Sequence, residues 1–411
     1  MRQLFRGLGW TPFSREKDPW NFLMPTLYGN FLYAKILPSE PENDNRGSHA
    51  AKNRCGGEGR GREGGSRHRN WRERTIFRAK CWAMRVAVTG ATGHIGVNVV
   101  RALTEQGHEV RALYRSPAKR ACLEGLPCET RQADILRPDS LQDAFRGVDA
   151  VIHLAALISI EGGKGGRVHR TNVEGVRHVV AACLRQGVSR LVHFSSVHAF
   201  KFRPNDPPVL DERCPPADAS SMAYDRSKAL GEQEVLRGVE RGLSAVILNP
   251  TAVIGPHDHW VSLTGQFFRE LFRGTLPALV RGGYDWVDVR DVARAACSAL
   301  QNGRPGERYL LSGHWADTRR IAEICREVSG VRPPALTLPL WTAYLGLPFL
   351  LPLARLTGRR PLYTYESLRT IQLAHPRCDN GKARRELGFR PRPLPDTIQD
   401  IYHWLKETQA V

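Results

Sequence analysis

Residues 85–96 read Arg-Val-Ala-Val-Thr-Gly-Ala-Thr-Gly-His-Ile-Gly, and this stretch decides the fold. It starts as a β-rich run, and residues 97–103 continue with the period of a helix. Strand, glycine turn and helix form the context that a dinucleotide-binding loop requires. Gly90 is expected to allow the tight turn, Gly93 to let the backbone approach phosphates, and Gly96 to let helix and strand pack closely. The helix N-terminus would then offer N–H groups to a pyrophosphate.

The next strand-like run, residues 109–115, ends without the acidic residue that would bind a ribose 2′-hydroxyl. Arg115 stands at its end instead, with Lys119 and Arg120 just beyond. A cation at this place suits a 2′-phosphate, so the sequence favours NADP over NAD as the cofactor. The alternative is that Arg115 is an ordinary solvated residue after a strand.

Residues 224–228 read Tyr-Asp-Arg-Ser-Lys, which places a phenol and an ammonium on one helix face. A nearby ammonium and an oxidised nicotinamide would stabilise the phenolate and lower the pKa of Tyr224 toward working pH. The phenol could then exchange a proton with a carbonyl or alcohol oxygen while hydride moves. Alone, this pattern is typical of a solvated helix face, and it gains meaning only from the glycine loop upstream.

Two hydroxyls end the apolar run of residues 191–197, at Ser195 and Ser196. The carboxyl end of a parallel strand faces the crevice where ligands bind, so a serine there could orient a substrate oxygen. Without the other motifs, a strand-ending turn would be the better interpretation.

Together these motifs resemble the extended short-chain dehydrogenase/reductase family, also called the NAD-dependent epimerase/dehydratase superfamily, from Met84 to about residue 405. Residues 133–135, 153–156, 171–173, 249–256, 287–293 and 382–389 resemble further signatures of this family. The resemblance implies a catalytic triad of Ser196, Tyr224 and Lys228, with Asn172 supporting a proton-relay water. It also implies that the cofactor is bound by Gly90, Thr92, Gly93, His94, Ile95, Gly96, Arg115, Asp134, Ile135, Ala155, Ala156, Lys228 and Pro250.

Substrate class is where members of this family differ. Members that act on nucleotide sugars usually carry an arginine just before the late Val-Asp-Val element, where this chain has Tyr284. The sequence is more similar to the branch of dihydroflavonol 4-reductases, 3β-hydroxysteroid dehydrogenases and hopanoid-associated "sugar epimerases". We therefore expect an NADP-dependent oxidoreductase that interconverts a ketone and a secondary alcohol on an apolar or polycyclic molecule. The alternatives are a sugar epimerase or dehydratase and, more distantly, a non-enzymatic NAD(P)-sensing protein.

Strand-like and helical runs alternate from residue 85 to about 255, which predicts an α/β fold with a Rossmann-type doubly wound parallel sheet. Residues 84–255 are expected to form the NAD(P)-binding domain. Residues 256–411 are expected to form mainly a smaller substrate lobe, with 286–304 returning to the Rossmann core. The lobe would lie over the carboxyl ends of the strands.

The first 83 residues have a different character, with an Arg/Gly-rich stretch and no sustained helical or strand period. They are expected to be disordered and to precede the true start at Met84. They hold 16 basic and 8 acidic residues, so +11 of the net charge of +19 belongs to the rest of the chain. This balance is not by itself a nucleic-acid signal, and we expect no nucleic-acid partner.

Nine cysteines without Cys-x-x-Cys spacing indicate a reducing compartment, here the cytoplasm, and no structural zinc site. His257-Asp258-His259 lacks a third clustered ligand, so no metal is expected there. By the family resemblance, the partner is a second copy of the chain in a homodimer formed through the helix that carries Tyr224.

Residues 334–354 are almost free of charge and about as long as a membrane span. Pro339, Pro348 and Pro352 are expected to break them into an apolar helix pair, so no transmembrane span is expected. One interpretation is that the pair walls the substrate pocket and makes a peripheral membrane contact. With the aromatic residues Trp260, Phe267, Phe268 and Trp286, it would then indicate an apolar or polycyclic substrate. The equal alternative is a lobe core or dimer contact.

Overall fold

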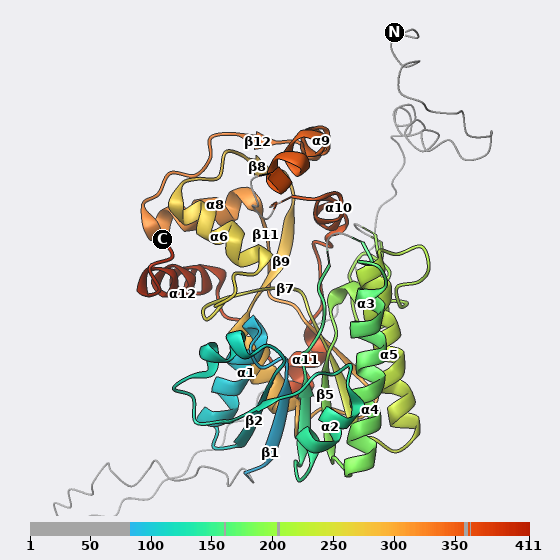
Figure 1. The fold of residues 1–411 in the computed structure, drawn as a ribbon. Coiled ribbons are helices and arrows are strands. Elements are labelled where there is room, and N and C mark those ends of the chain that lie inside the picture. The colour runs from blue at the N-terminus through green and yellow to red at the C-terminus, as the bar shows by residue number, and fades with distance from the viewer. Residues whose placement is uncertain (1–82, 160–161, 204–205, 357–360, 362) are drawn as a thin grey trace, which may run out of the picture. The chain divides into compact units, whose positions relative to one another are not determined.

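Seven parallel strands form the central sheet of the computed structural model (Figure 1). The structure describes residues 83–159, 162–203, 206–356, 361 and 363–411. The strand order is β10-β6-β5-β4-β1-β2-β3, and every neighbouring pair is parallel. The strands are β1 (Arg85–Thr89), β2 (Glu109–Tyr114), β3 (Glu129–Gln132), β4 (Ala150–His153), β5 (Arg190–Phe194), β6 (Ala245–Pro250) and β10 (Arg308–Leu311). The predicted Rossmann-type doubly wound sheet is confirmed.

Helices cover both faces of this sheet, which explains why its central strands, such as β1 and β4, bury side chains on both faces. Val86 and Val88 point into one core and Ala87 into the other. The first face is covered by α1 (His94–Glu105), α7 (Val289–Ala299) and α11 (Gly381–Leu387), and the second by α2 (Pro138–Phe145), α4 (Gly175–Gln186) and α5 (Ala223–Glu240). Short helical turns are η2 (Pro117–Leu123), α3 (Arg167–His169), η3 (Arg170–Glu174) and η4 (Val197–Ala199).

The second lobe is built on two small sheets, with strand orders β11-β9-β7 and β12-β8. Its strands are β7 (Ala252–Ile254), β8 (Leu279–Val280), β9 (Gly283–Asp288), β11 (His314–Asp317) and β12 (Thr337–Leu338). Its helices are α6 (Leu263–Arg273), α8 (Thr318–Ser329), α9 (Leu340–Leu356), α10 (Tyr365–Leu373) and α12 (Leu394–Glu407). Figure 1 shows this lobe on the opposite side of the glycine turn from the body of the sheet.

An aromatic cluster forms part of the core of the lobe. Phe267, Phe268 and Trp286 are all buried in one hydrophobic cluster, and the Trp286 indole N–H donates to the carbonyl of Ala316 (2.9 Å). Trp260 is the exception, since its ring is 44% exposed and lies 5.2 Å from the Lys119 ammonium. The three buried residues agree with the alternative of a lobe core, and Phe268 also lines a small pocket beside His94.

Several late segments belong to the Rossmann core. Helix α7 lies in the segment 286–304 and packs against α1. Two segments that the sequence analysis assigns to the lobe do the same: β10 pairs with β6, and Ala383 and Phe389 are buried in the core on the α1 side. The chain thus crosses between sheet and lobe more often than expected.

Residues 340–356 form one helix, α9, instead of the expected broken pair. Pro348 and Pro352 lie inside it, four residues apart and therefore on one side. Each removes one backbone hydrogen bond. Burial of Leu347 beside them helps to hold the helix together. None of the helices in the described ranges combines the length and hydrophobicity needed to cross a membrane. The expected disorder and late start of the first 83 residues fall almost wholly outside the described residues.

Candidate functional site

The glycine turn after β1 has a backbone that only glycine can supply. Gly90 has a positive φ of 68°, and a Cβ there would lie 2.8 Å from the backbone nitrogen of Ala155. A Cβ on Gly96 would lie 2.2 Å from the carbonyl oxygen of Gly90. The first turn of α1 therefore packs directly on the loop that precedes it, the close helix–strand packing that a dinucleotide-binding turn requires.

Thr89, at the end of β1, joins this turn to the segment after β4. Its hydroxyl lies 2.6 Å from His153 Nδ1 and accepts hydrogen bonds from the N–H groups of Leu154 (3.2 Å) and Ala155 (3.3 Å). Burial lowers the pKa of His153 to about 3, so its imidazole is neutral. The strand order reverses between β1 and β4, which is where open α/β sheets bind ligands.

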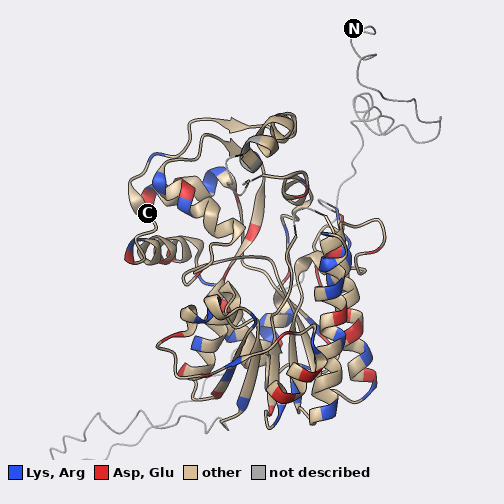
Figure 2. Ribbon diagram, in the orientation of Figure 1, with Lys and Arg blue, Asp and Glu red and all other residues tan. Residues whose placement is uncertain are grey.

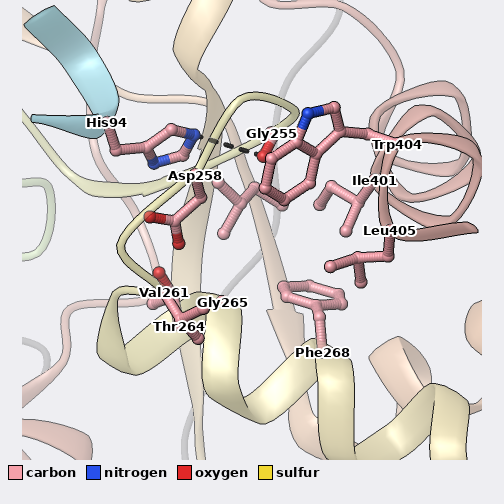
Figure 3. Close-up of a pocket in the computed structure, with 11 residues that line it drawn as sticks. His94, Gly255, Asp258, Val261, Thr264, Gly265, Phe268, Ile401, Trp404 and Leu405 are labelled. Atoms are coloured by element: carbon pink, nitrogen blue, oxygen red, sulfur yellow. Dashed lines mark hydrogen bonds between the residues drawn. The ribbon is translucent and has the colours of Figure 1, made fainter. Parts of the chain in front are cut away.

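His94, a predicted cofactor residue, points its side chain away from the turn. Its Nε2 lies 3.2 Å from the carbonyl oxygen of Gly255 and 3.1 Å from that of Pro256. Figure 3 shows it at the edge of a small pocket that Phe268 and Trp404 close from the lobe side. His94 therefore fastens α1 to the loop after β7, and only its backbone is suited to a phosphate.

Arg115 is exposed and directly follows β2. Its carbonyl accepts from the Gln132 side chain (3.1 Å), which holds its backbone at the end of the sheet. Its neighbour Lys119 is already engaged by the Trp260 ring. Of the two cations, Arg115 is therefore the better placed for a ribose phosphate.

The remaining predicted cofactor residues line the same end of the sheet. The Asp134 carboxylate accepts from the N–H of Leu136 (3.0 Å), and Ile135 is buried against Gly175. In and just after the glycine turn, Thr92 and Ile95 are half-buried and Gly93 is exposed. After β4, Ala155 is half-buried and Ala156 is exposed. Pro250 is the last residue of β6 and is buried.

The predicted catalytic residues come together between β5 and α5. The Lys228 ammonium donates to the carbonyl oxygen of Phe194 (2.8 Å), the last residue of β5. Ser196 follows two residues later, and its hydroxyl accepts from the N–H of His198 (3.2 Å). Tyr224 lies one turn before Lys228 on α5, with its ring 5.8 Å from that of His198.

Burial controls the ionisation of this group. It raises the pKa of Tyr224, and the Ser196 hydroxyl opposes that rise as a hydrogen-bond partner. It lowers the pKa of Lys228 to about 8, against the attraction of Glu232. In the protein without cofactor, the pKa of Tyr224 is thus shifted upward, because desolvation of the phenolate and the nearby Asp225 carboxylate outweigh the Ser196 hydrogen bond. A phenol that keeps its proton is suited to donating it.

Asn172 lies in the π-helical turn η3, a geometry often found at functional sites. Its side-chain amide donates to the Leu157 carbonyl (3.0 Å) and the Ser227 hydroxyl (2.9 Å), and its oxygen accepts from the Leu157 N–H (2.8 Å). Both amide hydrogens are thus used within the protein. Asn172 ties the loop after β4 to α5, and its oxygen keeps one further acceptor position.

A buried carboxylate beneath the site is absent from the sequence-based predictions. Glu232 is fully buried, accepts from the Asn249 amide (2.7 Å) and pairs with Arg308 (2.8 Å). The same amide donates to the carbonyl oxygen of Ser196 (2.9 Å). Glu232 lies four residues after Lys228 on the same helix face, and this spacing is the signal that could have revealed it.

No metal centre is apparent in the part of the chain that the structure describes, since it contains no group of three or more His, Cys, Asp or Glu side chains arranged to hold an ion. His257 and His259 instead pack against the Trp404 ring, at 6.3 and 5.7 Å between ring centroids.

The family model that matches this chain is the NAD dependent epimerase/dehydratase family, over residues 86–312. The chain belongs to this family. The matched region runs from β1 through β10 and includes the glycine turn, the serine after β5 and the Tyr-x-x-x-Lys helix. The resemblance to the extended short-chain dehydrogenase/reductases is thereby confirmed.

Individual relatives of this epimerase/dehydratase-family protein agree. It is 35% identical to the sterol demethylase protein B of Methylococcus capsulatus over 327 residues, 79% of this chain and 99% of the relative. It is 32% identical to a putative dihydroflavonol 4-reductase of Synechocystis over 78% of this chain and 94% of the relative. A crystal structure of a nucleoside-diphosphate-sugar epimerase from Pseudomonas aeruginosa superimposes with a TM-score of 0.64 at 26% identity, covering 80% of this chain and 99% of that one. The protein is an NAD(P)-dependent oxidoreductase of this family.

Proposed function

We propose that the protein is an NADP-dependent oxidoreductase that interconverts a ketone and a secondary alcohol on an apolar or polycyclic small molecule. The observation that carries this proposal is the grouping of Ser196, Tyr224 and Lys228 at the carboxyl end of β5, held by Lys228 Nζ on the Phe194 carbonyl. Phenol, hydroxyl and ammonium at the ligand-binding end of a parallel sheet are the groups that carbonyl reduction needs.

The glycine turn has the shape that a dinucleotide requires, because Cβ atoms on Gly90 and Gly96 would collide with the backbone around them. When bound, the nicotinamide supplies or accepts the hydride. Tyr224 would give its proton to the carbonyl oxygen and Ser196 would orient that oxygen. Lys228 would bind the nicotinamide ribose and favour the phenolate that remains. Asn172 would hold this arrangement and offer its free acceptor position to a relay water.

The preference for NADP rests on Arg115. Its exposure leaves the guanidinium free to meet a ligand, and its backbone is held at the end of β2. A guanidinium binds phosphate through two parallel hydrogen bonds, which supports a 2′-phosphate at this place.

The apolar substrate rests on Tyr284, at the position where a phosphate-binding arginine would stand. Tyr284 packs edge-on against Trp286 (5.3 Å between centroids) and joins the apolar cluster around Leu347 and Leu368. Burial, together with the nearby Tyr363, raises the pKa of the Tyr284 phenol, so this side chain stays neutral. The names of two relatives, which refer to a sterol and to a dihydroflavonol, support a polycyclic ketone or alcohol.

The alternative is a sugar epimerase or dehydratase, which the structural likeness to a nucleoside-diphosphate-sugar epimerase keeps in view. Titration with NADPH and NADH, followed by NADPH oxidation with steroid ketones and flavanonols, tests the proposal. Net oxidation and tighter NADPH binding support it. Tight cofactor binding without net oxidation by any ketone, with turnover of UDP- or GDP-sugars, would favour the epimerase instead.

The proposal extends to the domain boundaries, the oligomeric state and the cellular location of the protein. Residues 84–255 would be the NAD(P)-binding domain and 256–411 mainly the substrate lobe. Two copies would pair through the helix that bears Tyr224, in the cytoplasm, with no nucleic-acid partner. Sedimentation equilibrium of the purified protein tests the homodimer, and a monomer at micromolar concentration would refute it.

A further inference from the structure

Helix α9 exposes a row of large apolar side chains. Trp341, Leu345 and Phe349 follow one another at intervals of four residues, so they share one helix face. The exposed apolar side chains on α9 are Trp341 (64%), Leu345 (64%), Phe349 (79%), Leu350 (54%) and Leu356 (86%). Among the described residues, the exposed large apolar side chains gather most densely on this helix. Such a patch marks an interaction surface.

The opposite face of α9 fixes this row in place. Leu347 is fully buried, and Ala343, Tyr344 and Leu351 pack with it in the cluster that contains Tyr284 and Leu368. The Tyr344 ring also lies 6.3 Å from that of Tyr365 on α10. Because the inner face already fills the lobe core, α9 cannot turn its outer face inward. The exposed row is a stable feature of the fold.

Arginines outnumber acidic residues near the row. Arg332 is exposed shortly before α9, and the half-buried Glu366 of α10 is an acidic residue nearby in the sequence. Two more exposed arginines stand on neighbouring elements: Arg281, whose N–H donates to the Leu338 carbonyl, and Arg369 on α10, which packs against α9. A tryptophan-bearing apolar face with arginines around it is the pattern of a segment that lies in a membrane interface.

We propose that the outer face of α9 docks the substrate lobe on an anionic phospholipid surface. A second copy of this chain fits the face less well, because pairing two such faces would bring their arginines together. A bilayer with acidic headgroups accepts the apolar side chains and neutralises the arginines. The proposal goes beyond the oxidoreductase activity and does not depend on its substrate.

Gly162 and Gly163 lie close to α10 and to the start of the helix that bears Tyr224. A Cβ at Gly162 would lie 3.9 Å from Glu366 of α10, and one at Gly163 would lie 3.9 Å from the Cβ of Ala223, next to Tyr224. Figure 1 shows α9 at the end of the lobe farthest from the body of the sheet, with α10 drawn between α9 and α3. Docking through α9 would leave the glycine turn in water and bring the lobe that faces Tyr224 close to the lipid.

Flotation of the full chain with phospholipid vesicles tests this proposal. Vesicles of phosphatidylcholine with phosphatidylglycerol should carry the protein, and vesicles of phosphatidylcholine alone should carry much less. Leu345→Ser with Phe349→Ser should reduce the bound fraction by about tenfold or more, because each side chain stabilises binding only when buried. The matched control is Val209→Ser with Trp315→Ser, two exposed apolar residues elsewhere, which should bind as the wild type does.

Hydrogen exchange of the unmodified chain locates the contact without any substitution. Anionic vesicles should slow amide exchange in peptides that cover residues 340–356. Protection confined to residues 1–82, equal binding to neutral vesicles, or no flotation at all would overturn the proposal. So would a wild-type dimer that the α9 double substitution converts to a monomer, since the face would then be a contact between two chains.

Discussion

The Lys228 ammonium donates a 2.8 Å hydrogen bond to the carbonyl oxygen of Phe194, and this contact joins the helix of the Tyr-x-x-x-Lys motif to the end of β5. Ser196 lies two residues beyond the acceptor, and Tyr224 lies one turn before the donor. The three proposed catalytic side chains are thus positioned by a single strand end and a single helix. Their relative placement should persist when the lobe moves.

Tyr224→Phe removes the proposed proton donor while keeping the ring. We expect kcat for ketone reduction to fall by about 10²–10⁴-fold, with the Kd for NADPH changed little. Steady-state NADPH oxidation and a fluorescence titration measure the two quantities. Tyr402→Phe, in a ring that packs on Phe272 in the lobe, is the matched control. Unchanged turnover in Tyr224→Phe would exclude the phenol as the acid.

Gly96→Ala places a Cβ 2.2 Å from the Gly90 carbonyl oxygen, where backbone must move. The variant should lose about 1–3 kcal/mol of unfolding free energy and bind NADPH at least tenfold more weakly. Gly346→Ala on α9 is the control, because its new Cβ would meet only Leu350 at 3.5 Å. That change should leave cofactor binding as it is and stabilise the helix by about 0.5–1 kcal/mol. Equal effects of the two substitutions in urea unfolding would contradict this account.

Arg115→Ser tests the cofactor preference. Loss of a charge-assisted hydrogen bond to phosphate should weaken NADPH binding by about tenfold. This is the lower end of the range for such hydrogen bonds, because the site is exposed to solvent. NADH binding should change less than about twofold, since NADH has no 2′-phosphate. Arg146→Ser, an exposed arginine paired with Asp143, controls for a general loss of positive charge. If NADH and NADPH weaken together, Arg115 does not read the phosphate.

The buried pair of Glu232 and Arg308 supports the site from below. Arg308→Met alone should cost about 2–4 kcal/mol of unfolding free energy, because it leaves a buried carboxylate without its cation. Adding Glu232→Gln should recover part of that loss, since the glutamine oxygen can still accept from Asn249. A double-mutant cycle in guanidinium gives the coupling. Strictly additive losses would show that the pair contributes nothing as a pair.

The lowered pKa of Lys228 predicts that the protein becomes more stable as pH rises. Burial depresses its pKa from 10.5 in the unfolded chain to about 8 in the folded protein. Between these values the unfolded state holds more protons, so the unfolding free energy rises as pH increases, by up to about 3 kcal/mol from this residue. Lys228→Met should lack that contribution. Urea unfolding at several pH values measures it, and parallel curves for wild type and variant would refute the assignment.

The sequence predicted most reliably those features of the fold and the site that depend on residues close together in the chain. The glycine turn follows from the spacing of its glycines: a Cβ on Gly96 would collide with residues 90 and 91, which are close in sequence, although one on Gly90 would collide with residues 154 and 155. The parallel sheet with two covered faces follows from the alternation of strand-like and helical runs, whose apolar residues are buried on each face. Tyr224 and Lys228 share a helix face because of their spacing alone.

The sequence did not predict features that depend on contacts between residues far apart in the chain. Arg308 lies 76 residues after Glu232, and His94 reaches the carbonyls of Gly255 and Pro256. Three aromatic residues that the sequence left as either pocket wall or lobe core are buried in the lobe core. Two prolines remain inside α9 because tertiary packing outweighs a local preference.

The proposed function requires net hydride transfer to a ketone, with Tyr224 as the acid. The most direct test is the reduction of a polycyclic ketone with NADPH that carries deuterium at the transferring position of the nicotinamide. The account predicts an alcohol that bears deuterium on the new carbinol carbon, one NADPH consumed for each product, and loss of both signals in Tyr224→Phe. Inversion of a sugar carbon with no consumption of NADPH and no deuterium in the product would contradict it.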